Sequence, residues 1–159
     1  MLGRMGLGRA LEEETVAHAT YRSRVSVEHG ATIRQAVETM QREAVGSLLV
    51  LDGDRLAGIF TERDLVTRVL GPGRALDTPL ADVMTKQPTV TTSDEPIHLA
   101  LGRMLSGGHR HLPVIDAGGV PIGSISIKRA LHFLEDHLPK AIYNLPPEPG
   151  RFPARAEGG

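Results

Sequence analysis

Apolar residues follow two alternating spacings along this chain. In some stretches they recur every three or four positions, which is typical of one face of a helix, and in others they form short runs typical of strands. Turn residues such as Asp52-Gly53-Asp54 separate these stretches. For the first half we predict a strand at 24–27, a helix at 32–44, strands at 48–51 and 55–60, and a helix at about 61–70.

The second half of the chain repeats this order of elements. Leu56–Leu65 recurs, altered, as Pro121–Ala130, a spacing of 65, and Leu48–Asp52 corresponds to Leu112–Asp116 at a spacing of 64. A fixed period indicates one supersecondary unit that is used twice. In the second unit we predict a strand at 89–90, a helix at about 96–105, strands at 111–115 and 120–125, and a helix at about 127–137.

Each unit therefore reads strand, helix, strand, strand, helix, which predicts an α/β (α+β) fold built from two βαββα repeats. Before the repeats, 10–19 has the pattern of a short helix. After them, a stretch rich in Pro, Gly and Arg predicts disorder. The expected division is an N-terminal segment with a short helix (1–20), a first repeat (21–73), a linker with the second repeat (74–138) and a largely disordered C-terminal tail (139–159).

Composition narrows the classes of function. A chain of 159 residues with 40% hydrophobic residues fits one compact domain or two small repeats that share a core. The net charge of −1 leaves no general basic footprint for nucleic acid or an acidic membrane surface. The absence of Cys excludes disulfides and thiolate chemistry. With no apolar run of membrane-spanning length and no signal core, the expected location is cytoplasmic.

Three motifs carry a resemblance to a known family: Gly58–Leu65, Leu80–Thr85 and His109–Asp116. Their order and the repeat resemble the CBS domain pair, or Bateman module, in its stand-alone bacterial form. The resemblance implies two repeats packed about a pseudo-two-fold axis with two clefts between them, and a homodimer formed through helices. It also implies that AMP, ADP, ATP, NAD(H) or S-adenosylmethionine binds in a cleft as a regulatory ligand, without catalysis.

The strongest candidate for a ligand-binding group is Asp64. Thr61-x-x-Asp64 begins a helix directly after a strand, and one interpretation is a capping box that satisfies backbone N–H groups. The other is that the carboxylate accepts ribose hydroxyls while Thr61 faces a phosphate. In the family the equivalent residues do this, so the resemblance favours Asp64 as the ribose ligand.

Cations near the helix starts indicate a bound anion. Arg63 and Lys128 occupy corresponding positions of the two units, where a cation is unfavourable by roughly 0.3 to 1 kcal/mol unless an anion offsets the cost. In similar modules the basic pair at Leu-Pro-Val, here Arg110 and His111, approaches the phosphate of the bound nucleotide. The predicted phosphate-binding residues are Thr61, Arg63, Arg110, His111, Ser126 and Lys128.

Only one of the two clefts keeps the acidic residue. In the second unit Arg129 stands where Asp64 stands in the first, and a guanidinium has no acceptor for ribose hydroxyls. We therefore expect one adenosine site per chain, with the second cleft empty or holding an anion. The resemblance places the adenine against residues whose alternative role is plain core and turn packing: Ser26, Val27, Val45, Gly46 and Ser47.

Other functions find less support in the sequence. An enzyme would need a nucleophile with a base or paired carboxylates, and we identify no catalytic residue and no required cofactor. His109-x-His111 offers two possible metal ligands without a third, so no metal is expected. The remaining alternative is a structural or protein-interaction scaffold with vestigial clefts. The sensor hypothesis requires an unidentified protein partner, and neither nucleic acid nor a membrane is expected to bind.

Overall fold

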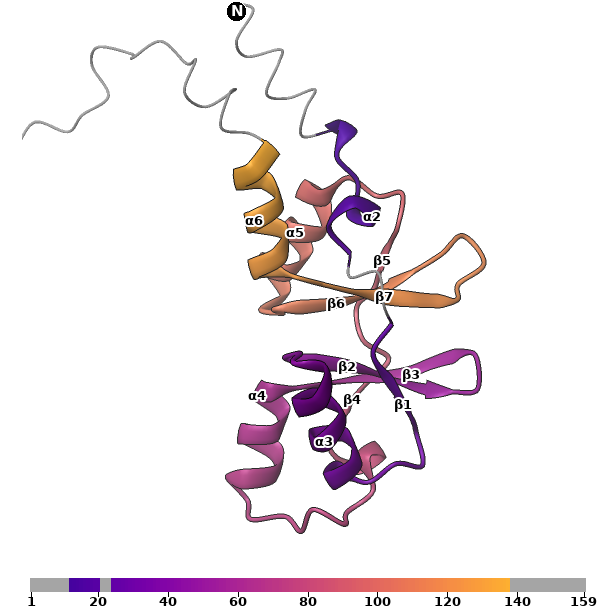
Figure 1. Ribbon diagram of the computed structural model, residues 1–159, viewed down its shortest axis with the longest axis vertical. Coiled ribbons are helices and arrows are strands. Elements are labelled where there is room, and N and C mark those ends of the chain that lie inside the picture. The colour runs from indigo at the N-terminus through magenta and orange to yellow at the C-terminus, as the bar shows by residue number, and fades with distance from the viewer. Residues whose placement is uncertain (1–11, 21–23, 138–159) are drawn as a thin grey trace, which may run out of the picture.

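The computed structural model describes residues 12–20 and 24–137, which form two stacked units that each have one sheet and covering helices (Figure 1). In the first unit the sheet order is β1-β2-β3-β4, with β1 parallel to β2 and the other pairs antiparallel. Its elements are β1 (Ser26–Glu28), α3 (Ile33–Glu43), β2 (Ser47–Asp52), β3 (Arg55–Thr61), α4 (Glu62–Asp64), the π-helix η1 (Leu65–Leu70) and β4 (Thr85–Lys86).

The second unit repeats this arrangement with the sheet order β5-β6-β7, in which β5 is parallel to β6. Its elements are β5 (Thr91–Thr92), α5 (Ile97–Gly107), β6 (His111–Ile115), β7 (Pro121–Ser126) and α6 (Ile127–His137). The predicted α/β class and the βαββα order are confirmed in both units. The tail expected to be disordered lies outside the described residues, as do residues 10 and 11 of the helix expected at 10–19. That helix is not continuous as predicted, because it is interrupted at Glu14 and Thr15, where Thr15 forms a β-bridge with Pro96.

Two strand predictions were wrong in their bounds, and one predicted helix is present but differs in its geometry. The first strand begins at Ser26, two residues later than predicted, because its ladder pairs it with Leu49–Leu51 of β2. In the second unit the first strand is β5, again two residues later than predicted. The helix expected at 61–70 is α-helical only to Asp64 and then widens, with a bond from Gly71 N to Val66 O, five residues back.

Side-chain capping and hydrophobic spacing explain why α3, the first helix of the first unit, forms. Thr32 accepts from Gln35 N at 3.3 Å through its hydroxyl, and Gln35 Oε1 accepts from Thr32 N at 2.9 Å, so the two residues form a capping box. The apolar face of α3 is buried against β1 and β2. The same packing is repeated by α5 on the second sheet, and the buried residues of these two cores include Ile33, Ala36, Met40, Leu48, Phe60, Ile97, Ala100, Met104, Leu112 and Ile125.

Two short segments are exchanged between the units. Helix α2 (Val16–Ala19) precedes the first unit in the sequence, but Val16 is fully buried in the core of the second, against α5 and α6. The 3-10 turn η2 (Leu80–Asp82) precedes the second unit, but Leu80 is fully buried in the core of the first. Val16 and Leu80 are 64 residues apart, the spacing of the repeat. Each lead-in therefore completes the core of the other unit.

Candidate functional site

A cleft of about 1400 Å³ lies between the two units. The first unit contributes the end of α3, the loop that follows it and the junction from β3 into η1. The second contributes the loop before β6 and the start of α6, and residues of the linker between the units complete the wall. The cleft brings together ten of the predicted site residues: Val45, Gly46, Ser47, Thr61, Arg63, Asp64, Arg110, His111, Ser126 and Lys128.

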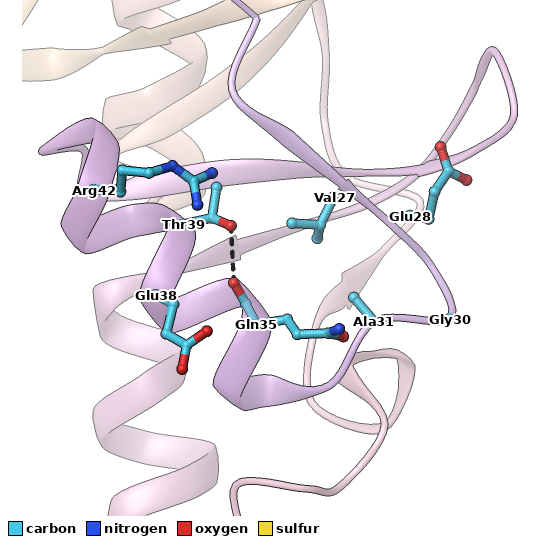
Figure 2. Close-up of a pocket in the computed structure, with 8 residues that line it drawn as sticks. All are labelled: Val27, Glu28, Gly30, Ala31, Gln35, Glu38, Thr39 and Arg42. Carbon is cyan, nitrogen blue, oxygen red and sulfur yellow. Dashed lines mark hydrogen bonds between the residues drawn. The ribbon is translucent and has the colours of Figure 1, made fainter.

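The cleft does not include Ser26 or Val27, which were predicted to contact the adenine. Val25 lines it instead. Val27 lies in β1, two residues after Val25 and roughly 6.6 Å further along the extended chain. It lines a separate shallow pocket of about 530 Å³ beside α3. Figure 2 shows that pocket, with Val27 facing α3 and the hydroxyl of Thr39 bonded to the carbonyl of Gln35.

Asp64 is the last residue of the short helix α4, and it is buried, with only 7% of the residue exposed. Its Oδ2 accepts from Thr61 N at 3.0 Å and lies 3.0 Å from Thr61 Oγ1, while Asp64 N donates to that hydroxyl at 3.2 Å. The capping-box interpretation is therefore confirmed. It engages one carboxylate oxygen and leaves Oδ1 to other partners.

Arg68 is the neighbour of that second oxygen, and the sequence analysis did not identify it. Its Nε lies 3.5 Å from Asp64 Oδ1, and its Nη1 donates to Val83 O at 3.1 Å and to Met84 O at 2.9 Å. The acid-base spacing of four residues on a helix was the available signal. Arg68 thus joins the helix that carries Asp64 to the linker between the units.

Cationic side chains outnumber acidic ones along the cleft. Arg63 reaches across it, since its Nη1 donates to Gly108 O of the second unit at 3.4 Å. Arg68, Arg110 and Lys128 also line the cleft, against the acidic Glu62 and Asp64. An anionic ligand would be attracted to such a surface, because opposite charges interact more strongly in a partly enclosed site than in water.

The imidazole of His111, which lines the cleft, has a lowered pKa. Burial lowers the pKa of its imidazole from the usual 6.5, Glu62 acts in the opposite direction, and Arg110 lowers it further. Gly46 lies between the two side chains, because a Cβ there would be 3.1 Å from Glu62 Oε2 and 3.6 Å from His111 Nε2. At neutral pH this imidazole is uncharged, and it offers a neutral hydrogen bond instead of a charged one.

The arginine at the position of Asp64 in the second unit does not line the cleft. Arg129 donates from Nε to Ala19 O at 2.8 Å, and its backbone N donates to Ser126 Oγ at 3.1 Å. In the first unit the equivalent carbonyl is that of Val83, 64 residues after Ala19, and Arg68 supplies the donor. In both units an arginine therefore donates to the equivalent carbonyl, but the arginine comes from a different position of the helix.

Within 12–20 and 24–137, no three His, Asp or Glu side chains are grouped so that they could hold a metal ion. The helices of the same residues are all too short or too polar to cross a membrane.

Known sequences are similar to this chain over most of the described residues. The sequence model of the CBS domain family matches residues 17–71 and 80–136. A 17.7 kDa protein of Acidianus ambivalens is 38% identical over 111 residues, which are 69% of this chain and 66% of that protein. CBS domain-containing proteins of Arabidopsis thaliana are 34 to 35% identical, and this chain spans only 23 to 24% of their length.

Solved structures share the fold. A protein with CBS domains from Burkholderia ambifaria is 31% identical with a TM-score of 0.71, over 76% of this chain and 93% of that one. A CBS domain protein from Pyrobaculum aerophilum, in complex with AMP, is 23% identical with a TM-score of 0.70, over 77% of this chain and 99% of that one.

Proposed function

The chain belongs to the CBS domain family, and we propose that it is a non-catalytic regulatory module that binds an adenosine nucleotide in the cleft between its two units. AMP, ADP, ATP and NAD(H) are the proposed ligands. The observation that carries this proposal is a buried carboxylate, Asp64, in a cleft whose charged lining residues are mostly cations. The AMP complex of the Pyrobaculum protein supports the same ligand class.

In this proposal the ribose lies against Asp64. A carboxylate has about four acceptor positions, and Thr61 and Arg68 do not occupy all of them. A ribose hydroxyl can donate to Oδ1, whose neighbour Arg68 is at 3.5 Å, beyond the range of a normal hydrogen bond. The adenine would then lie against the apolar part of the cleft, which includes Val25, Val37, Met40 and Val45.

The phosphate is proposed to lie among the cations of both units. Arg63, Arg110 and Lys128 would contact it directly, His111 would offer a neutral donor, and the hydroxyls of Thr61 and Ser126 complete the set. Charge-assisted hydrogen bonds contribute about 1.5 to 3 kcal/mol each. Two or three of them with adenine burial give micromolar affinity, about −8.2 kcal/mol, after the costs of association.

The charge of the cleft favours nucleotides over S-adenosylmethionine. That ligand has a sulfonium where a nucleotide has its phosphate, and it would bring a positive charge towards Arg63, Arg110 and Lys128. We therefore place phosphate-bearing adenosine compounds ahead of sulfonium compounds for this chain.

We also propose that the module forms a homodimer through its outer helices and acts in the cytoplasm on a separate protein partner. Val66 and Leu70 of η1 are 58% and 61% exposed, and Leu131 of α6 is 49% exposed. Figure 1 places α4, which leads into η1, and α6 at the same side of the two units. Apolar side chains exposed at one side of a molecule are typical of a surface that another protein covers.

A thermal-shift panel tests the proposed function. Ligand at about 100 times its dissociation constant stabilises by about 2.7 kcal/mol, which raises the melting temperature by several degrees. We expect this shift with at least one of AMP, ADP, ATP and NADH, and a smaller one with S-adenosylmethionine. If no adenosine compound changes the melting temperature, the scaffold alternative is favoured, in which Asp64 serves only as a cap.

A further inference from the structure

Arg68 contacts the proposed ligand site and the linker at the same time. Its three contacts divide between Asp64, at 3.5 Å, and the two successive carbonyls of Val83 and Met84, at 3.1 and 2.9 Å. The bonds to the carbonyls have ordinary hydrogen-bond lengths, whereas the contact to the carboxylate is longer. The guanidinium is therefore held by the linker and is only loosely paired with Asp64.

The linker that receives these bonds is packed firmly against the first unit. Val83 and Met84 are buried, and Thr85 pairs with Ile59 in the ladder between β3 and β4. Gly58 makes this approach possible, because a Cβ there would lie 2.6 Å from Thr85 O and 2.9 Å from Met84 Sδ. A displacement of the carbonyls of Val83 and Met84 would therefore act on β4, which follows them directly and pairs with β3.

Beyond β4 the same linker runs along the cleft and enters the second unit. Gln87 adopts a left-handed backbone conformation, with φ of 48°, and Pro88 and Thr89 line the cleft before β5 begins. The segment from Val83 to Thr89 thus connects Arg68, the cleft wall and the second sheet.

We propose that Arg68 is a positioning residue that couples occupancy of the nucleotide site to the linker 83–89. When a ribose hydroxyl donates to Asp64 Oδ1, the carboxylate attracts the guanidinium less strongly, and Arg68 bonds more tightly to Val83 O and Met84 O. The coupling is reciprocal. A partner that binds only when this linker is displaced lowers nucleotide affinity by the same factor by which the nucleotide lowers the affinity of that partner. This inference rests on the proposed nucleotide site and specifies how that site is regulated.

Hydrogen exchange with AMP as the probe tests the coupling. In the wild-type protein, AMP should slow exchange of the amides in 83–89 by about fivefold or more, within the usual range of coupling energies. In Arg68→Gln, AMP should still bind, with protection confined to the residues of the cleft outside 83–89. Arg68→Lys keeps the charge but loses the planar fork, and it should also lose the effect on the linker.

Arg103 supplies a matched control. It too bonds a carbonyl and a carboxylate, those of Val90 and Glu95, but it does not line the cleft. Arg103→Gln should leave the effect of AMP on 83–89 unchanged. Melting curves of all three variants establish that each is folded under the conditions of exchange.

The outcomes distinguish the two claims. If AMP binds the wild-type protein but leaves exchange of 83–89 unchanged, or protects this segment equally in Arg68→Gln, the coupling is refuted and the proposed nucleotide site stands. If titration of AMP into the wild-type protein gives no binding, the site for this ligand is refuted and the coupling with it. Protection that is lost in both Arg68 variants and kept in Arg103→Gln supports both.

Discussion

Arg129 Nε and the carbonyl of Ala19 are joined by a hydrogen bond of 2.8 Å that ties α6 to the end of α2. The equivalent carbonyl of the first unit, on Val83, receives its donor from Arg68, one helical turn beyond the position of Asp64. In the first unit the donor comes from Arg68, so the position of Asp64 can hold a carboxylate. In the second unit Arg129, the donor, occupies the corresponding position. The arginine in the second unit is explained by its structural contact.

Replacing this arginine by the acid of the first unit should not create a second site. In Arg129→Asp the carbonyl of Ala19 loses its donor, which should cost about 1 to 3 kcal/mol of unfolding free energy in urea titrations. The number of AMP molecules bound per chain should stay at one. Unchanged stability together with a second bound nucleotide would contradict this account of Arg129. Arg34→Ala, at an exposed ion pair, is the control and should change stability by less than about 0.5 kcal/mol.

The exchanged lead-ins should contribute to a single folding transition. Val16→Ala should cost about 1.5 to 3 kcal/mol and Leu80→Ala about 2 to 5 kcal/mol, because both side chains are fully buried. Each variant should shift the whole unfolding curve without splitting it, since each segment completes the core of the other unit. An unfolding curve with two separate steps, or no effect of Val16→Ala, would show that α2 is not part of the core.

Gly58 should not tolerate a side chain. In Gly58→Ala the new Cβ would lie 2.6 Å from the carbonyl of Thr85, and the displacement of β4 should cost about 1 to 3 kcal/mol. Gly30 is the matched control, because a Cβ there meets nothing within 4 Å. Denaturant titration of both variants gives the comparison. Equal losses at the two positions would argue against the close approach of β4.

His111 should make the protein less stable in acid. Its pKa in the folded protein is below 6.5, mainly through burial, so below that pH the unfolded chain binds a proton that the folded protein does not yet bind. Unfolding free energy should therefore fall as the pH decreases through this window. The fall should be smaller in His111→Gln, measured by urea titration well above and about one unit below pH 6.5. A fall of equal size in both proteins would contradict this role of burial.

The sequence predicted the order of elements because the hydrophobic spacing is repeated and the turns are marked by Gly, Pro and Asp. It did not predict β4, since two residues carry too little pattern for a strand. The role of the N-terminal segment was also missed, although extending the repeat by 64 residues aligns Val16 with Leu80. That exchange depends on which unit a segment packs against, and local spacing does not contain this information.

The same distinction applies to the site. Asp64 and the basic residues could be identified because their motifs are contiguous in the chain. The contribution of Val25, the exclusion of Val27 and the link from Arg68 to Val83 all depend on tertiary contacts.

Isothermal titration with the nucleotide that most raises the melting temperature, into the wild-type protein and Asp64→Asn, tests the proposed site most directly. Asparagine keeps an oxygen for Thr61 but loses the charge and an acceptor for ribose. We predict one nucleotide per wild-type chain with micromolar affinity, and at least about tenfold weaker binding, or about 1.4 kcal/mol, in the variant. Equal affinity in the two proteins would contradict the assignment of Asp64 as the ribose ligand.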